Sequence, residues 1–109
     1  MVTRQVGFLG SATDEGVAVV VDVRLPNVLR PLVGGEAVVT AGGETLREVF
    51  DDLASRYPGL GPSLRTPEGE IHRHLNVFLN DDDVRYLGRL DAKVGASDTV
   101  TLMPAVAGG

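Results

Sequence analysis

One amphipathic helix stands among segments of alternating apolar residues, and this arrangement restricts the chain to few folds. Apolar residues recur at intervals of three and four between Thr45 and Tyr57, which predicts a helix with one buried stripe. Thr45 and Glu48 have the spacing of a capping box, in which each side chain binds a free backbone N–H. Pro58 and Gly59 end the helix. The stripe, which we expect to pack against a sheet, consists of Leu46, Val49, Phe50, Leu53, Ala54 and Tyr57.

Strand-like alternation occurs on both sides of this helix. Residues 17–25 place valines and a leucine on one face, and residues 36–41 form a second predicted strand after a turn region at 27–35. Because their connection is short, the two strands are expected to form an antiparallel hairpin with a wide loop. A long connection follows over residues 58–74, with room for a short helical turn near residues 63–65.

The last part of the chain predicts three more strands. Residues 75–79 alternate again, and Asn80-Asp81-Asp82 favours a tight turn because Asn and Asp tolerate positive φ. Residues 83–87 are expected to form a short partner strand, and residues 99–103 the final strand. Pro104 is expected to stop regular pairing, because proline has no N–H to donate. The predicted fold is α+β: a mixed sheet whose middle holds the last strand, with one main helix across one face and the opposite face open.

Composition limits the classes of function. A chain of 109 residues with 43% apolar residues favours one globular domain. There is no cysteine, which excludes disulfides, thiolate metal sites and a cysteine nucleophile. A net charge of −5 and a single lysine, Lys93, argue against a nucleic-acid surface and favour basic protein partners. No apolar run approaches the roughly 20 residues of a membrane helix, and the start lacks a secretory signal pattern, so we expect a cytoplasmic protein without membrane or nucleic-acid partners.

The chain divides into an N-terminal arm or extra strand at residues 1–16, a body at 17–103 and an extended tail at 104–109. The tail is uncharged and almost without side chains: Pro104, Ala105, Val106, Ala107, Gly108 and Gly109. Because glycine has no Cβ, the terminal carboxylate of Gly109 can enter a passage too narrow for other residues. Six extended residues reach roughly 20 Å beyond the body. The alternative is an ordinary frayed end or a cloning remnant.

Other candidate sites in the sequence have simpler explanations. His72 and His74 have a spacing that can bind a metal, but no third ligand stands nearby, which favours ordinary surface residues. Asp81-Asp82-Asp83 lacks the spacing of ligand residues that a calcium-binding loop has. Gly34-Gly35 lacks the Gly-Lys-Ser/Thr that completes a phosphate loop. We therefore predict neither a metal site nor a catalytic set.

A docking surface is predicted on the open sheet face. Phe78, Thr101 and Met103 lie on this face if the alternation holds, and an exposed aromatic and methionine are typical of contact with a partner. The alternative is that the N-terminal arm or a neighbouring molecule covers them. Arg30 and Arg85 are further candidates, which flank either this face or the tail.

Four segments of the chain carry a resemblance to a known protein family. They are Leu25-Pro26 with Leu29-Arg30-Pro31, Ile71-His72-Arg73 leading into Asn76, the turn Asn80-Asp81-Asp82-Asp83-Val84-Arg85, and the ending Leu102-Met103-Pro104-Ala105-Val106-Ala107-Gly108-Gly109. Together they resemble the ubiquitin-like β-grasp sulfur carriers, the group that includes ThiS, MoaD and CysO, and the CysO type most of all. The resemblance covers about residues 17–109. The ending alone is weakly specific, and its combination with the turn is much stronger.

The resemblance implies a protein cosubstrate rather than an enzyme, with no bound cofactor. An adenylating partner of the ubiquitin-activating type would use ATP to form an acyl-adenylate at Gly109, and a persulfide from a sulfurtransferase would replace AMP to leave a thiocarboxylate. In CysO-type systems the sulfur passes to an activated serine on a PLP-dependent cysteine synthase, and a metallopeptidase then releases cysteine. The partner channel would hold Ala105, Val106, Ala107 and Gly108.

Other end uses of the same terminus remain open from the sequence. The sulfur could serve molybdopterin synthase, with the chain as its small subunit, or a pathway that makes a thio-natural product. The chain could instead be a ubiquitin-like modifier that conjugates to lysines through Gly109. It could also be an interaction domain whose Gly-Gly ending is accidental.

Overall fold

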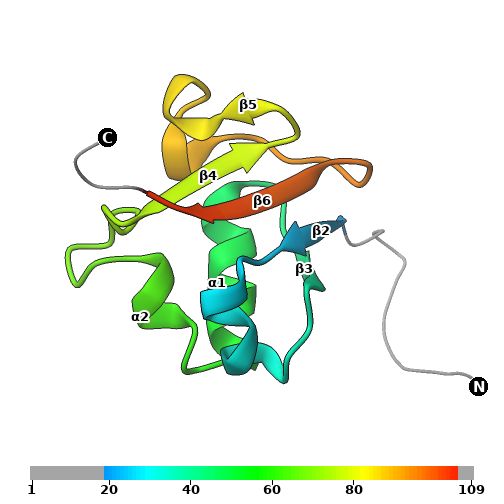
Figure 1. Ribbon diagram of the computed structural model, residues 1–109. Helices are drawn as coiled ribbons and strands as arrows, with labels where there is room; N and C mark the ends of the chain where they lie inside the picture. Colours follow the sequence, from blue (N-terminus) through cyan, green and yellow to red (C-terminus); the bar gives the residue numbers. More distant parts are fainter. Residues whose placement is uncertain (1–18, 106–109) are drawn as a thin grey trace, which may run out of the picture.

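A computed structural model describes residues 19–105, which form a five-stranded mixed sheet crossed by one long helix (Figure 1). The predictions for residues 1–16 and for Val106 to Gly109 therefore lie outside the described residues. The elements in chain order are β2 (Val20–Arg24), the 3-10 helix η1 (Asn27–Val33), β3 (Val38–Gly42), α1 (Leu46–Arg56), α2 (Gly61–Leu64), β4 (Leu75–Leu79), β5 (Asp82–Asp83), the 3-10 helices η2 (Val84–Tyr86) and η3 (Arg89–Asp91), and β6 (Thr99–Pro104).

The sheet has the strand order β3-β2-β6-β4-β5, so the last strand lies in the middle as predicted. β2 pairs antiparallel with β3, which confirms the predicted hairpin. β6 pairs parallel with β2 and antiparallel with β4, which makes the sheet mixed. The predicted α+β fold is confirmed. Within residues 19–105 we find no helix with the length and apolar character needed to cross a membrane.

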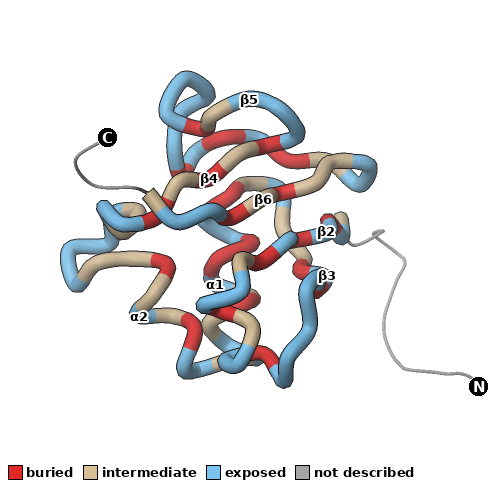
Figure 2. Tube along the Cα trace, viewed as in Figure 1, coloured by how far each residue is buried: buried red, intermediate tan, exposed pale blue. Residues whose placement is uncertain are grey.

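Helix α1 covers one face of the sheet and supplies much of the core. Its predicted stripe is buried at Leu46, Val49, Phe50 and Leu53, and Figure 2 shows these buried segments facing the buried segments of the strands. The capping box forms with a shift of one residue. Thr45 Oγ1 accepts the N–H of Glu48 at 3.3 Å, while the Glu48 carboxylate accepts the N–H of Glu44 at 2.8 Å.

Short 3-10 helices form in two segments, the predicted turn region and the predicted partner strand. The turn region after Pro26 contains η1, which buries Leu29 and Val33 against the core. The predicted partner strand at residues 83–87 is wrong beyond its first residue. β5 consists of Asp82–Asp83, and the chain then bends into η2 because Asp83 Oδ1 accepts the N–H of Arg85 at 2.9 Å, which turns Val84 into the core.

Pro104 does not stop regular pairing, contrary to the prediction. It lies opposite Leu75 in the β4–β6 ladder, and the N–H of Ala105 still donates to the carbonyl oxygen of His74 at 2.9 Å. In an antiparallel ladder alternate residues face the same neighbour, so the nitrogen of Pro104 faces away from β4, toward β2. The pairing of β2 with β6 ends at Thr101. The missing N–H therefore breaks no hydrogen bond of the sheet.

The outer edge of β3 is occupied by side chains from α1. Asp52 accepts the N–H of Gly42 at 2.9 Å, and Arg56 donates to the carbonyl oxygen of Thr40. Asp52 and Arg56 also form an ion pair at 3.1 Å. Because these side chains take up backbone groups that an edge strand leaves free, they hinder the addition of another strand along residues 40–42.

Candidate functional site

The chain leaves the sheet at the end of β6, where β2 ends and β4 begins. Pro104 is exposed there and Ala105 is half-buried. The other predicted channel residues and Gly109 lie outside the described part. Ala105, where the described part of the chain ends, still donates its N–H to the carbonyl oxygen of His74. The predicted reach of roughly 20 Å therefore counts two residues, Pro104 and Ala105, that are still held beside the sheet.

A groove of about 340 Å³ lies at the base of the tail. Apolar side chains of Val28 and Leu29 from η1 line one part of it, together with Pro104 and Ala105. His72 and His74 line another part. The first residues of the tail therefore emerge beside a mixed apolar and imidazole surface.

His72 and His74 lie close together, with ring centroids 5.1 Å apart. Nδ1 of His72 accepts the backbone N–H of His74 at 3.2 Å, so Nε2 is the ring nitrogen of His72 left for other contacts. Across residues 19–105, no three His, Asp or Glu side chains gather in an arrangement that could hold a metal ion. His74 is exposed and His72 is half-buried.

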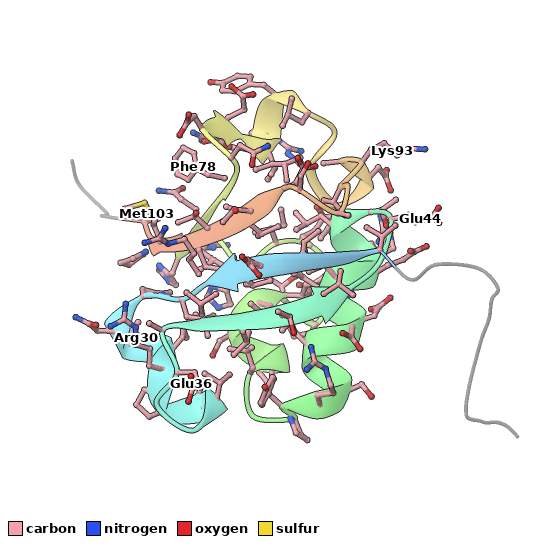
Figure 3. The ribbon with its side chains drawn as sticks, turned by 90° about the vertical axis from the view of Figure 1, so that its right-hand side faces the viewer. Arg30, Glu36, Glu44, Phe78, Lys93 and Met103 are labelled. Carbon is pink, nitrogen blue, oxygen red and sulfur yellow. The ribbon has the colours of Figure 1, made fainter. Side chains whose placement is uncertain are left out.

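The open sheet face holds the three apolar and hydroxyl side chains predicted for it. Phe78 pairs with Thr101, and Met103 lies one pair further along the same face, opposite Asn76. Because Val77 and Leu102 are buried beneath α1, these alternate residues point away from the helix. Met103 is 48% exposed, and Figure 3 shows Phe78 and Met103 toward the end of the sheet where β6 finishes. Their role in docking stays a prediction.

The two candidate arginines lie in different places. Arg30 lines a cavity on the open face with Arg24, Val38 and Thr101, so it flanks the predicted docking surface. Arg85 lies instead beyond β5, where its guanidinium contacts the Asp83 carboxylate at 2.8 and 3.1 Å. Arg24 is a site residue that the sequence reasoning did not select. The alternation of residues 17–25 put it on the outer face, but its nearness to Arg30 depends on η1.

Asp83 and Arg85 form a local ion pair whose titration follows from its hydrogen bonds. The side chain of Arg85 and then its backbone N–H hold the pKa of Asp83 below its ordinary value, against the opposing effect of partial burial. The same contact raises the pKa of the Arg85 guanidinium. The Asp83 side chain is 13% exposed and that of Arg85 is 60% exposed. The pair therefore fixes the β5–η2 turn rather than offering Arg85 as a free cation.

Replacing Asp83 by asparagine is expected to lower the free energy of unfolding at neutral pH by about 0.5 kcal/mol. The asparagine side chain can still accept the N–H of Arg85, but the negative charge is lost. Since the folded-state pKa of Asp83 lies below its unfolded value, the carboxylate stabilises the fold above the unfolded pKa of about 3.9. That contribution disappears as the pH falls through the folded-state pKa. Urea titrations from neutral to acid pH should show the two proteins converging. An equal difference at every pH would contradict this account, and Asp81→Asn serves as an exposed control.

Residues 23–109 match the model of the ThiS family. The sulfur carrier protein CysO of Mycobacterium tuberculosis is 44% identical over 91 residues, which are 82% of this chain and 98% of that protein. The crystal structure of M. tuberculosis CysO aligns with a TM-score of 0.75 and 42% identity, covering 79% of this chain and 99% of that one.

Two further relatives are similar over most of their length. A chain in the crystal structure of the Amycolatopsis orientalis BexX/CysO complex has a TM-score of 0.75 and 47% identity, covering 82% of this chain and 99% of that one. Small archaeal modifier protein 3 of Haloferax volcanii is 29% identical over 90 residues, which are 81% of this chain and 97% of that protein. The described β-grasp sheet and the family match agree. The chain belongs to the ThiS family and is a homologue of the CysO sulfur carrier proteins.

Proposed function

We propose that the chain carries sulfur as a thiocarboxylate on Gly109 and donates it to a PLP-dependent cysteine synthase. The observation that carries the proposal is 44% identity to CysO across 98% of that protein. Sulfur carriers of the ThiS and CysO type are small protein cosubstrates rather than catalysts. The chain has no cysteine, so its terminal carboxyl group is the natural place for the sulfur.

The terminal carboxylate must be activated before it can accept sulfur. It is ionised at neutral pH, since a C-terminal carboxyl group has a pKa of about 3.5, and a carboxylate is a poor acyl donor. An adenylating enzyme of the ubiquitin-activating type joins it to AMP from ATP and releases pyrophosphate. The outer sulfur of a persulfide on a sulfurtransferase then attacks the carbonyl carbon and AMP leaves. A thiol cleaves the remaining S–S bond and is itself oxidised to a disulfide, which frees the thiocarboxylate.

Donation of the sulfur to the acceptor, followed by hydrolysis, regenerates the carrier. The thiocarboxylate sulfur bonds to the β-carbon of serine whose hydroxyl has been activated as a leaving group, in an enzyme that supplies PLP. The acyl group then moves from sulfur to the amino nitrogen, which joins Gly109 to cysteine by a peptide bond. A metallopeptidase hydrolyses that bond. The chain itself contributes a terminus of two glycines, Gly108 and Gly109, and a sheet face that partners can contact. The BexX/CysO complex of a relative that is 47% identical supports partner docking.

Intact-mass spectrometry tests the first half of this scheme. The chain is incubated with its adenylating enzyme, magnesium, ATP and hydrosulfide, which displaces AMP without a reductant. The expected product is heavier by the difference between one sulfur and one oxygen atom, and AMP forms in equal amount. A variant that lacks Gly108 and Gly109 should keep its original mass. If the full chain binds the enzyme and ATP is present, an unchanged mass would overturn the proposal.

A protein modifier is the second candidate, supported by 29% identity to small archaeal modifier protein 3. In that case Gly109 would form an amide bond with a lysine of another protein. Mass spectrometry of digested lysates would reveal lysines that carry the C-terminal peptide of this chain. A pure sulfur carrier leaves none.

A further inference from the structure

We propose that the cavity between Arg24, Arg30, Val38 and Thr101 receives a carboxylate side chain of the adenylating enzyme. The cavity has a volume of about 180 Å³ and lies on the open face of the sheet. The inference rests on the proposed function, because it assigns a chemical feature to the partner that acts on Gly109. We call this cavity the arginine seat.

Strand register builds the seat. Arg24 of β2 lies between Thr101 of β6 and Val38 of β3, and all three alternate with buried residues. Their side chains therefore share the face opposite α1. Arg30 comes from η1, which follows β2 after the turn at Pro26. Two guanidinium groups from different elements thus meet at one hollow.

The charges of the seat are not neutralised within the part of the chain that the structure describes. Eight arginines lie there, and four form ion pairs with aspartates: Arg47, Arg56, Arg65 and Arg85. Arg24 and Arg30 form none with any carboxylate in residues 19–105, although Asp22 and Glu36 are near them in sequence. Two unpaired guanidinium groups at one hollow, in a chain of net charge −5, favour an anionic guest. Their planar N–H groups match a carboxylate.

The seat is preorganised on one side and apolar on the other. Nε of Arg30 donates to the carbonyl oxygen of Leu25 at 3.0 Å, and its guanidinium also contacts Asn27 Oδ1. These bonds hold the side chain, so less rotational freedom is lost when a partner binds. Val38 is 43% exposed and Met103 on the same face is 48% exposed. Apolar atoms beside a charge pair exclude water, which strengthens the electrostatic attraction.

The arginine seat lies close to the base of the tail. Arg24 pairs with Thr101, three residues before Pro104, so the seat lies at the end of the sheet from which the chain departs. Figure 3 shows Arg30 and Met103 at one end of the sheet, and Glu44 and Lys93 at the other. An enzyme that holds the tail must approach this end. It meets the open face, because α1 side chains occupy the edge of β3 and β5 is two residues long.

Kinetics of thiocarboxylate formation test the seat. The double variant Arg24→Ala/Arg30→Ala should raise the KM for the carrier about tenfold, because a charge pair across the interface is lost. The kcat at saturating carrier should be unchanged, since Gly109 still reaches the active site. Added salt should raise the KM of the wild type more than that of the variant. The single variant Arg24→Glu leaves the backbone contact of Arg30 in place and should weaken binding at least as much.

Arg47→Ala/Arg65→Ala is the matched control, because it removes two arginines and the same net charge from sites away from the seat. It should keep the KM of the wild type. If the KM rose equally in both double variants, the effect would come from overall charge, and the proposed seat would be rejected. The proposal would also be rejected if ATP or AMP bound directly to the isolated chain and this binding disappeared in Arg24→Ala/Arg30→Ala. The cavity would then bind a nucleotide rather than a carboxylate side chain.

Separate measurements distinguish failure of the seat from failure of the proposed function. The dissociation constant of the carrier–enzyme complex is measured beside the mass change. A wild type that forms the complex without gaining sulfur contradicts the proposed function, and the seat is then judged by the dissociation constants. A wild type that gains sulfur with the same KM as the double variant contradicts the seat alone. A wild type that forms no complex contradicts both.

Discussion

Replacing Gly108 by valine is expected to lower kcat/KM for thiocarboxylate formation about a hundredfold or more, with the free energy of unfolding unchanged. The proposed reaction requires a carboxylate oxygen of Gly109 to lie in line with the α-phosphorus of ATP. The carbonyl carbon of Gly109 must then face the sulfur nucleophile. Valine adds a branched side chain next to that carbon and restricts the backbone. A displacement of about 1 Å of a reacting atom costs about this much in rate. Stability should persist, because the buried core extends from Val21 to Leu102.

Initial rates with hydrosulfide, followed by intact mass, measure the effect. Ala107→Gly is the matched control, because it changes the neighbouring residue while removing atoms from the tail, and it should react like the wild type. Equal rates for Gly108→Val and the wild type would show that the partner does not enclose the end of the tail tightly. The narrow channel inferred from the Gly-Gly ending would then be rejected.

The elements that could be predicted from sequence are those with a repeating burial pattern. α1 follows from the spacing of Leu46, Val49, Phe50 and Leu53, and β4 follows from alternation over residues 75–79, because burial on one face imposes these periods. The central position of the last strand agrees with its two buried residues, Val100 and Leu102. Each of these features follows from residues that are close together in the sequence.

The parts that could not be predicted depend on distant contacts. η1 and η2 are too short to show a period, and they form where the core accepts Leu29 and Val84. Pro104 remains in the ladder because β2 has already ended beside it, which is a property of a strand some 80 residues earlier in the chain. Arg24 faces outward by alternation alone, but only the path of η1 brings Arg30 to it. The seat therefore emerges from the tertiary structure.

Replacing Phe50 by alanine is expected to lower the free energy of unfolding by about 3–5 kcal/mol. Phe50 is 0% exposed and is the largest of the fully buried side chains, on the face of α1 that packs against the sheet. Alanine leaves a cavity that the surrounding strands can close only in part. The loss is a large share of the roughly 5–15 kcal/mol that holds a typical domain folded. Urea unfolding should show a lower midpoint with an unchanged slope.

Val28→Ala is the control for this change, because Val28 is 69% exposed in η1 and its loss should cost at most about 0.5 kcal/mol. A cost below about 1.5 kcal/mol for Phe50→Ala would contradict the described packing of α1 on the sheet. At a temperature where the Phe50 variant is still folded, its rate of thiocarboxylate formation should equal that of the wild type. The substitution leaves the tail and the arginine seat unchanged. We therefore expect Phe50→Ala to lower the stability alone, and Gly108→Val to lower the rate of sulfur loading alone.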